Sequence, residues 1–501
     1  MGYENVKNDW RQGRLVYQVF VDRFAKARNS KQISGQEESP SLYCVPRTSK
    51  QWNQSPKRGE FLSQFGVWSH ELEFWGGNLR GVTEKLDYLK NLGVEIIYLT
   101  PIFEAVTNHR YDTCNYFKID PLLGNHEDLK TLCNEARARG LRIILDGVFN
   151  HIGSRSDWFQ SAKNDGNSPY KNFFEFSTNF KNGYRAWKGV ANLPELCLEN
   201  SETQKAIFQN KNSVIKHYLD QGIDGWRLDV AHDIGPTLLQ KITTSAHRTA
   251  RYSLIIGETW NYPLKWTGAE KVPAMDAVIN FFFRGLILSL CKQELSANQF
   301  IKAVGETINE CGIDAIRRSW LVLDNHDTPR LPNVLQNQKV RQLARVLQFT
   351  LPGCPQLYYG DEVDMAGADD PENRAPMPWD ELENNKDHFL HRLIQLYRAS
   401  PALRWGDCKF FIGEQLLVFG RGSENFEQMR IVVINPSSKQ REETIVIPDY
   451  RISHHGWTED TFTSKRYQFE TASMHLSLEP YEFLVLKPLL SEGEYFPYRR
   501  L

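Results

Sequence analysis

The segment Gly222-Ile-Asp-Gly-Trp-Arg-Leu-Asp-Val-Ala-His-Asp233 decides the fold of this chain. Its centre, Gly225 to Asp229, predicts a short buried strand that presents Arg227 and Asp229 on the same side of a pleated backbone. A neighbouring guanidinium lowers the pKa of a carboxyl group, so we expect Asp229 to be ionised at neutral pH, as a carboxylate nucleophile must be. Taken alone, the pair also fits a structural ion pair at a strand end. The rest of the chain has to decide between these interpretations.

Seven further apolar runs resemble this strand, and segments with helical spacing separate them. The eight predicted strands are residues 15–24, 94–100, 141–146, 225–229, 253–258, 277–280, 319–324 and 355–359. Such continuous apolar content is typical of parallel strands that are buried on both faces. Helices are predicted, among other places, at 82–92, 126–139 and 202–221. The alternation favours an α/β fold in which a closed (β/α)8 TIM barrel is more fitting than an open sheet.

Three other parts of the chain depart from this alternation. Residues 25–69 are rich in Ser, Gln, Lys and Pro, and we expect a loop that is partly disordered. A small irregular insertion after the third strand, residues 152–200, is predicted as a domain B within a catalytic barrel domain at 1–402. Short apolar runs between Gly, Asn, Pro and Ser then predict a C-terminal antiparallel β-domain, a sandwich at 403–488, followed by a tail at 489–501.

Acidic side chains collect at the carboxyl ends of the predicted strands. Asp146, Asp229, Glu258 and Asp327 end or closely follow the third, fourth, fifth and seventh of them. In a (β/α)8 barrel this rim carries the active site, because the loops there converge on one axis. Acids crowded into one place are destabilising unless chemistry uses them, which argues against four unrelated structural acids.

Two of these acids fit the requirements of glycoside hydrolysis. That reaction needs two carboxyl groups beside the scissile bond, one ionised and one protonated. Asp229 is the ionised candidate, while Glu258 lies beside Trp260, where burial and nearby anions favour a retained proton. Asp327, preceded by His326, can accept hydrogen bonds from sugar hydroxyls.

Four motifs together resemble the α-amylase family, glycoside hydrolase family 13. They are Asp146-Gly-Val-Phe-Asn-His151, Gly225-Trp-Arg-Leu-Asp229, Gly257-Glu-Thr-Trp260 and Asp324-Asn-His-Asp327, and the resemblance runs from about Leu15 to Pro488. It implies Asp229 as nucleophile, Glu258 as acid/base and Asp327 as transition-state stabiliser, with retention of the α configuration. It also implies the substrate-binding residues Tyr111, Asp112, His151, Arg227, His326, Asp370 and Arg374, and we expect His232, Trp260 and Trp266 on the acceptor side.

A finer resemblance is to the neopullulanase, cyclomaltodextrinase and maltodextrin glucosidase branch, carried by residues 257–280, 358–362 and 374–379. It implies hydrolysis of α-1,4 bonds, with α-1,6 bonds left open, in maltodextrins or cyclodextrins. Cys197 follows Leu193-Pro-Glu-Leu196 where that branch has Asn, which leaves bond specificity open. About fourteen residues precede the first strand, where those enzymes carry an N-terminal β-domain that helps them dimerise, so the oligomeric state also stays open.

Two alternatives remain beside the hydrolase. An α-glucosyl transferase or isomerase can use the same barrel, because a sugar can resolve a glycosyl-enzyme intermediate as well as water can. A catalytically silent scaffold protein is the second alternative. The intact Asp229, Glu258 and Asp327 argue against the scaffold.

Composition and cysteine usage limit the partners and the compartment. The formal net charge of -1 gives no basis for binding nucleic acid or an anionic membrane, and the apolar runs are too short for a membrane span. The eight scattered cysteines contain no Cys-x-x-Cys pair, and the start of the chain lacks a signal peptide, so we expect a cytoplasmic protein. No organic cofactor is required. A structural calcium is left open, because Asn150 matches a family ligand whereas Asp233 stands where many calcium-binding members have His.

Overall fold

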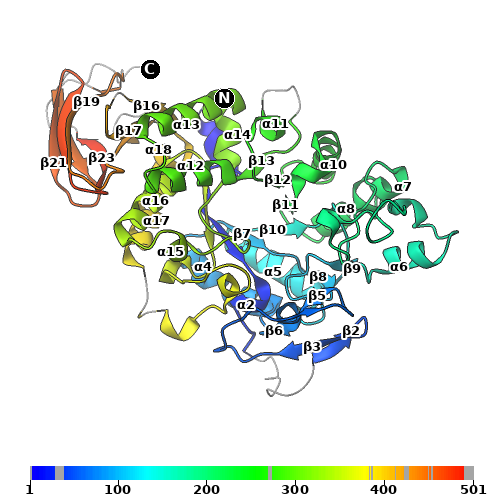
Figure 1. The fold of residues 1–501 in the computed structure, drawn as a ribbon. Coiled ribbons are helices and arrows are strands. Elements are labelled where there is room, and N and C mark those ends of the chain that lie inside the picture. Colours follow the sequence, from blue (N-terminus) through cyan, green and yellow to red (C-terminus); the bar gives the residue numbers. More distant parts are fainter. Residues whose placement is uncertain are drawn as a thin grey trace.

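Eight parallel strands close into a barrel in the order β1-β15-β14-β13-β12-β11-β10-β7 (Figure 1). This computed structural model describes residues 3–28, 39–268, 273–382, 384, 387–411, 413–422, 428–449, 451–452 and 455–489. The barrel strands are β1 (Val16–Val19), β7 (Ile96–Leu99), β10 (Arg142–Gly147), β11 (Gly225–Leu228), β12 (Leu254–Thr259), β13 (Ala277–Asn280), β14 (Trp320–Val322) and β15 (Cys354–Tyr358). Each overlaps a predicted strand, which confirms the TIM barrel. The first is shorter than predicted, because Val21–Phe24 forms the helix α2.

Alternate residues of these strands point into the barrel, and most of them are apolar. The interior cluster consists of Val16, Ile96, Tyr98, Ile144, Leu254, Ile256, Ala277, Ile279, Phe281, Trp320, Val322 and Cys354. Polar residues continue these inward rows at the carboxyl ends, at Gln18, Asp146, Arg227 and Glu258. Asp146 lies directly opposite Arg227 in the register of β10 and β11. The pleat of the strands therefore aims these side chains into the mouth of the barrel.

Helices surround the barrel and cover its outer face with apolar side chains (Figure 1). The longer ones are α3 (Leu79–Glu84), α4 (Leu86–Leu92), α5 (His126–Ala138), α8 (Val214–Asp220), α10 (Pro236–Thr249), α12 (Phe281–Cys291), α13 (Ala297–Cys311), α16 (Gln338–Thr350) and α17 (His388–Ala399). The start of α5 shows how the sequence sets a boundary. Asn125 Oδ1 accepts hydrogen bonds from the backbone of Glu127 and Asp128, so an N-cap satisfies amides that lack helical partners.

The prediction of a single helix at 202–221 is wrong. The chain instead forms α7 (Ser201–Gln204), which continues into the π-helical turn η4 (Lys205–Gln209), and then α8 after a break. At the break, Asn210 has an extended backbone, and the carbonyl of Phe208 accepts a hydrogen bond from the Ser245 hydroxyl of α10. That carbonyl is therefore satisfied from a neighbouring helix, which the local sequence does not reveal.

The segment after β1 also differs from its prediction. Residues 29–38 lie outside the described residues, but 39–74 are not loop throughout. They contain β2 (Ser39–Leu42), β3 (Val45–Ser49), β4 (Phe61–Leu62), β5 (Val67–Trp68), the 3₁₀ helix η1 (Ser69–Leu72) and β6 (Glu73–Phe74). Val45, Val67 and Leu72 share a buried cluster with Val106 and Cys114. This small core explains why a largely polar segment is ordered.

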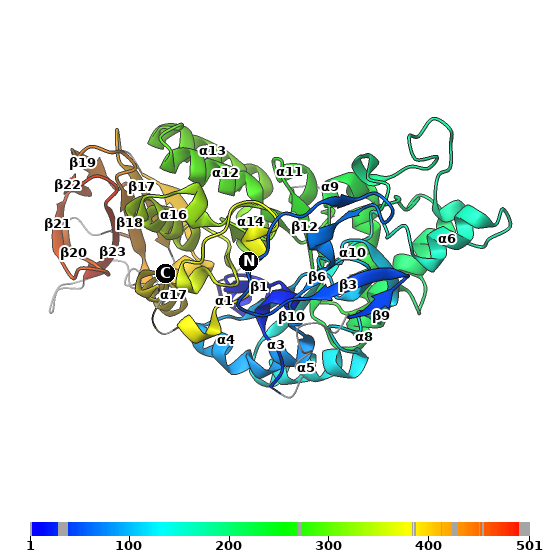
Figure 2. The same cartoon turned by 60° about the horizontal axis from the view of Figure 1, so that its bottom comes forward.

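A second insertion follows β10 and lies next to the hairpin β8 (Phe103–Ala105) and β9 (Thr113–Ile119) (Figure 1). It contains α6 (Asp157–Asn164) and the short turns η2 (Lys171–Phe173) and η3 (Trp187–Gly189) between irregular stretches. It lies at one end of the molecule, with the C-terminal sheet at the other end, as the turned view also shows (Figure 2). The predicted irregular insertion after the third barrel strand is therefore present.

The C-terminal part is one antiparallel sheet in the order β16-β17-β18-β23-β20-β21-β22-β19. Its strands are β16 (Asp407–Phe410), β17 (Leu417–Gly422), β18 (Arg430–Ile434), β19 (Arg441–Val446), β20 (His455–Asp460), β21 (Arg466–Glu470), β22 (Ser473–Leu478) and β23 (Phe483–Leu489). Glu443 on β19 accepts a hydrogen bond from the backbone of Gln415, just before β17, so the two ends of the sheet curl toward each other. An apolar cluster of its own lies inside the curl. The predicted tail lies outside the described residues except for Leu489.

Several shorter helices connect these parts. They are α1 (Tyr3–Asn8), α9 (Ala231–Ile234), α11 (Leu264–Thr267), α14 (Ile313–Arg318), α15 (Leu331–Val334), α18 (Pro401–Trp405), η5 (Asp361–Val363), η6 (Glu372–Arg374) and η7 (Trp379–Glu381). In the part of the chain that the structure describes, no helix has both the length and the apolar character needed to cross a bilayer.

Candidate active site

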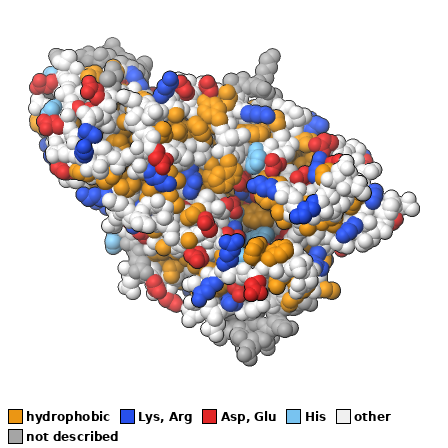
Figure 3. Space-filling model, in the orientation of Figure 1, with side chains coloured by type: hydrophobic (Ala, Val, Ile, Leu, Met, Phe, Trp, Pro, Cys, Tyr) orange, Lys and Arg blue, Asp and Glu red, His pale blue; other side chains and the backbone are white. Residues whose placement is uncertain are grey.

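A cavity of about 1030 Å³ opens at the carboxyl ends of the barrel strands and appears as a hollow in the surface (Figure 3). Nine of the thirteen site residues predicted from the sequence line it: Tyr111, His151, Asp229, His232, Glu258, Trp260, Asp327, Asp370 and Arg374. The other four, Asp112, Arg227, Trp266 and His326, are buried and do not line the cavity. The barrel thus brings all the predicted residues to one place, but some of them support others rather than face the cavity.

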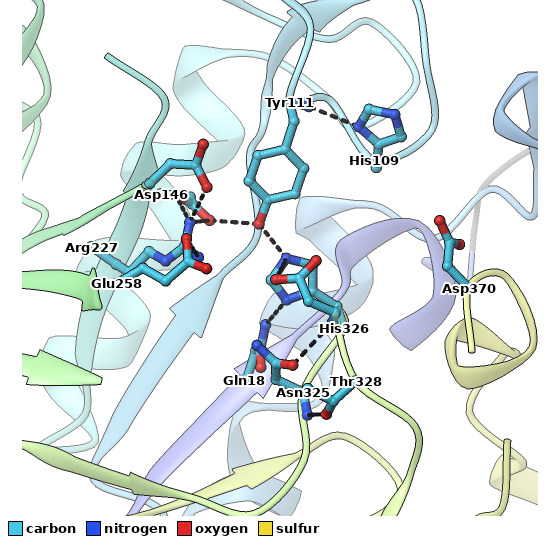
Figure 4. A network of polar contacts seen from close by, with 12 residues as sticks. Gln18, His109, Tyr111, Asp146, Arg227, Glu258, Asn325, His326, Thr328 and Asp370 are labelled. Carbon is cyan, nitrogen blue, oxygen red and sulfur yellow. Dashed lines mark hydrogen bonds and ion pairs between the residues drawn. The ribbon is translucent and has the colours of Figure 1, made fainter. Parts of the chain in front are cut away.

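Arg227 joins three carboxyl groups at the floor of this cavity (Figure 4). Its Nη1 donates to Asp146 at 2.8 Å and to Asp229 at 2.8 Å, and its Nη2 donates to Glu258 at 2.9 Å. The guanidinium is fully buried, so these hydrogen bonds are protected from competing water. Asp229 and Glu258, from neighbouring strands, are consequently held close to each other.

The charge balance of this cluster corrects one expectation from the sequence. Burial raises the pKa of Asp229 well above its ordinary value; Arg227 opposes the shift, and the charges of Glu258 and Asp146 add to it. Arg227 lowers this pKa as predicted, but burial outweighs its effect, so the expected net direction of the shift is wrong. In the ligand-free site, burial therefore disfavours the ionised form of Asp229.

A second chain of hydrogen bonds runs from the barrel interior to Asp146 (Figure 4). Gln18 Nε2 lies 2.7 Å from His326 Nδ1, His326 Nε2 lies 2.5 Å from the Tyr111 hydroxyl, and that hydroxyl donates to Asp146 at 2.9 Å. Gln18 Oε1 is occupied by the amide of Gln356, which leaves its Nε2 to donate to the imidazole. His326 therefore carries its proton on Nε2.

Two histidines of the site, His326 and His151, have pKa values that burial lowers. Burial lowers the pKa of His326 well below its ordinary value, and Arg374 and Arg227 lower it further. Burial also lowers the pKa of His151 to about 3. His151 Nε2 lies 3.8 Å from Asp229 and has no hydrogen-bond partner among the described residues, so it is free to meet a sugar hydroxyl.

Asp327 and Asp370 are linked through one arginine on the far side of the cavity. Arg374 Nη2 lies 3.6 Å from Asp327 and its Nη1 lies 3.0 Å from Asp370. Burial raises the pKa of Asp327, an effect that Arg374 counteracts. Arg374 also donates to the carbonyl of His326 at 2.9 Å, which anchors the guanidinium. This part of the lining thus offers two fixed carboxylates to hydroxyl groups.

Asp112 has a different place from the one that its motif suggests. It is fully buried and accepts hydrogen bonds from Thr107 and from the side chain of Asn192. These contacts join the loop after β8 to the second insertion. The geometry supports a positioning role for Asp112, because its neighbour Tyr111 lines the cavity and Asp112 does not.

Two tryptophans near Glu258 also differ from each other. Trp260 is 46% exposed, donates its Nε1–H to Glu258 at 2.7 Å and stacks on Phe281 at 3.8 Å between ring centroids. Trp266, expected on the acceptor side, is buried and donates to Asn261 at 3.0 Å. Of these two rings, only Trp260 is exposed beside Glu258.

Sequence reasoning missed several residues that line the cavity. Phe61, Trp68, Glu71 and His109 come from the segments after β1 and β7, and Trp187 stacks on His151 at 5.3 Å. Trp187 has some signal in the sequence, since an aromatic residue within an irregular insertion commonly contacts sugar rings. Phe61 and Trp68 have none, because their place depends on the strand pairs described above.

The residues considered for calcium do not assemble into a cage. Asp233 Oδ2 accepts the indole N–H of Trp187 at 2.9 Å, while the side-chain amide of Asn150 lies 3.5 Å from His151. No group of three His, Cys, Asp or Glu that could hold a metal ion occurs within the described ranges. Calcium prefers six to eight oxygen ligands. The arrangement does not fit this ion.

Comparison with known proteins gives the family. A model of the alpha amylase catalytic domain matches residues 18–395. A cyclomaltodextrinase of Geobacillus thermopakistaniensis (strain MAS1) is 32% identical over 491 residues, which cover 95% of this chain and 77% of the relative. An intracellular maltogenic amylase of Bacillus subtilis is 32% identical over 402 residues, 79% of this chain and 63% of the relative.

A solved structure extends the similarity over nearly the whole fold. The cyclic α-maltosyl-(1→6)-maltose hydrolase from Arthrobacter globiformis, in complex with that sugar, has a TM-score of 0.76 and 29% identity, covering 95% of this chain and 99% of its own. With its barrel, its four motifs on the expected strands and these relatives, the chain belongs to the α-amylase family of glycoside hydrolases.

Proposed function

We propose that this protein is a retaining α-glucan hydrolase that cleaves α-1,4 glucosidic bonds in maltodextrins or cyclodextrins by double displacement. The observation that carries the proposal is the bridge that Arg227 makes between Asp229 and Glu258. One guanidinium can bind both groups only if they lie close together. Retaining enzymes hold their two carboxyl groups about 5 Å apart, whereas inverting enzymes leave room for a water between them.

The roles of the two acids are those that the family resemblance implies. Asp229 attacks the anomeric carbon as the C–O bond breaks, and Glu258 gives its proton to the departing oxygen. Water then attacks the same carbon, the ester bond to Asp229 breaks, and Glu258 takes the proton of the water. The sugar keeps its α configuration, and both acids return to their starting states. Asp327 and the uncharged His326 and His151 steady the sugar that is attacked.

The lining supports further parts of the proposal. Tyr111, Asp370 and Arg374 hold the glycone, and Arg227 and Asp112 keep the catalytic acids and Tyr111 in place. The relatives named above act on cyclodextrins or maltose-containing sugars according to their names, which supports an α-glucan as the substrate. Cleavage of α-1,6 bonds remains an open part of the specificity.

Transfer to a sugar acceptor is the second candidate activity. The exposed ring of Trp260, next to the acid, is a stacking surface for the sugar that would replace water. An isomerase would use the same step within one substrate. A silent scaffold is not supported, since Asp229, Glu258 and Asp327 all line the cavity.

We also propose how the chain is divided and where it works. Residues 1–402 serve catalysis, with 152–200 as domain B, and 403–488 form a separate unit, which its own apolar cluster supports. The cytoplasm is the proposed compartment, because all eight cysteines are free thiols and a relative is named as intracellular.

Product analysis tests the proposal. Purified protein is incubated with maltotriose, β-cyclodextrin, soluble starch and pullulan, and the products are separated by chromatography while NMR records the first anomer released. We expect α-anomers, and we expect Asp229→Asn and Glu258→Gln to lower turnover at least about a thousandfold without loss of fold. Asp364→Asn, an exposed acid paired with Arg341 outside the cavity, is the matched control. First release of β-anomers, or near-normal rates in either catalytic variant, would sink the assignment.

A further inference from the structure

The segment after β1 brings two aromatic rings to one end of the active-site cavity. Phe61 on β4 and Trp68 on β5 face each other across the hairpin, with ring centroids 5.5 Å apart at 68°. Both line the cavity, and Phe61 is 54% exposed. A large apolar ring held open to solvent at the rim of a binding cavity points to contact with a ligand.

The hairpin stands at the glycone end. The leaving group must lie beside Glu258, because that acid protonates the departing oxygen, and Figure 4 shows Asp370 on the opposite side of the site. Glu71, three residues after Trp68, lies 3.6 Å from His109 at that side. Its carbonyl accepts the backbone N–H of Asn108 at 2.7 Å. The rings therefore lie where the non-reducing part of a substrate chain would extend.

Hydrogen bonds hold this hairpin in one position. The backbone of Ser69 donates to the carbonyl of Glu60 at 2.8 Å, and that of Gly59 donates to His70 Nδ1 at 3.1 Å. The Arg58 guanidinium lies 5.1 Å from the centroid of the Trp68 ring. Because backbone and side-chain contacts both fix it, the hairpin can resist a substrate chain that reaches it.

The tip of the hairpin meets the second insertion. Arg155 of that insertion donates to the carbonyl of Tyr43 at 3.2 Å and reaches toward the carbonyl of Gln64. A Cβ at Gly66 would lie 3.9 Å from Asn192 Cβ, so the tip lies within contact distance of that insertion. The two insertions thus meet at this end of the cavity.

We infer that the β4–β5 hairpin is an end wall that limits how many glucosyl units fit on the glycone side. The favoured substrates are then short linear α-glucan chains and chain ends, so the inference narrows the proposed function to linear maltodextrins rather than cyclodextrins or interior bonds of polymers. This inference rests on the proposed function and names the substrate class of the same site. A wall excludes longer chains by steric conflict, whereas a stacking platform would attract them. The edge-to-face ring pair and the contact between the tip and the second insertion favour the wall, because the two rings form no continuous flat surface.

Aryl α-maltosides with glycones of different length test this inference, since the leaving group stays the same. We would compare kcat/KM for release of the aryl group from the maltoside and from the maltoheptaoside. In Phe61→Ala and in Phe61→Ala/Trp68→Ala we expect the ratio of kcat/KM for the long substrate to kcat/KM for the short one to rise about tenfold. This is the lower end of the discrimination that pocket shape gives between substrates of different size. Trp457→Ala, which removes a 44% exposed ring in the C-terminal sheet, is the matched control and should leave the ratio unchanged.

Binding measurements separate this inference from the proposed function. In a Glu258→Gln background, calorimetry with maltose and maltoheptaose should show the same gain for the longer sugar when the rings are removed. A ratio that falls or stays constant in both assays overturns the wall, and a fall identifies the rings as a platform. If the wild-type protein releases no aryl group from either substrate, the proposed function fails, while calorimetry still decides on the wall. The single variant Phe61→Ala keeps the test valid if loss of Trp68 disturbs folding.

Discussion

Replacing Gln18 by leucine tests whether a residue in the barrel interior controls the tautomer of His326 at the active site. The change removes the 2.7 Å hydrogen bond to His326 Nδ1 and places an apolar side chain of similar size in the inward row of β1. His326 is 1% exposed, so water cannot replace the lost donor. The imidazole is then free to move its proton to Nδ1, which would take the proton away from Tyr111.

The expected size follows from the burial of this contact. Leaving a buried acceptor unpaired costs about 1–3 kcal/mol. If the transition state needs the native tautomer, this free energy appears in kcat/KM as a loss of about 5- to 150-fold, at about 1.4 kcal/mol per tenfold. Part of the same cost appears in the free energy of unfolding, so the kinetic and stability effects must be measured separately.

A double-mutant cycle distinguishes positioning from simple structural damage. We would measure kcat/KM with an aryl α-maltoside for Gln18→Leu, His326→Phe and the double variant, and we expect a coupling of about 0.5–3 kcal/mol because Gln18 acts through His326. Gln348→Leu is the control, since this buried amide donates to the carbonyls of Leu321 and Gln356 and does not touch the site. Additive losses in the cycle, or wild-type kinetics in Gln18→Leu, would refute the reasoning.

Three other outcomes are expected. The pKa of His151 is lowered to about 3, so as pH falls below about 6.5 the unfolded chain binds a proton at this residue while the folded chain does not. The free energy of unfolding should therefore fall by roughly 2 kcal/mol by about pH 5. Urea denaturation of His151→Gln should show a smaller fall than that of the wild type. Trp260→Ala should lower transfer relative to hydrolysis of maltotriose by about 2- to 10-fold with little change in Tm, since ring stacking contributes about 0.5–1.5 kcal/mol; an unchanged product ratio on chromatography would contradict this. Adding calcium or a chelator should shift the Tm by less than about 1 °C in calorimetry, because Asp233 is engaged by Trp187; a clear rise with calcium would show a site that the contacts do not reveal.

The barrel could be predicted from the sequence because its strands are buried on both faces. Such strands appear as continuous apolar runs, and β13 at Ala277–Asn280 was predicted with the bounds that the structure has. The placement of Asp146, Arg227 and Glu258 followed from the same pattern, since they end those runs. Their roles in catalysis stay a prediction.

The elements that were predicted wrongly depend on contacts between residues that are distant in sequence. The hairpin of β4 and β5 is held by the buried cluster around Val67 and Leu72, to which Val106 contributes from after β7. Likewise, the break before α8 depends on Ser245 from another helix. Neither contact has a periodicity that a local reading can detect. The two cavity rings Phe61 and Trp68 were missed for the same reason.

Asp229 and Arg227 lie side by side as expected, but other acids share the guanidinium. The pKa of Asp229 therefore shifts in the direction opposite to the expected one. Two residues of sequence separation suggested that Arg227 belongs to Asp229, but the register of the barrel places Asp146 opposite Arg227 and brings Glu258 from the next strand. One cation among three buried acids cannot ionise them all at low cost, so burial dominates and the pKa of Asp229 rises. A closed barrel makes such sharing unavoidable, because every inward row ends at the same axis. The same crowding that brings three acids to one guanidinium therefore raises the pKa of Asp229 in the ligand-free site.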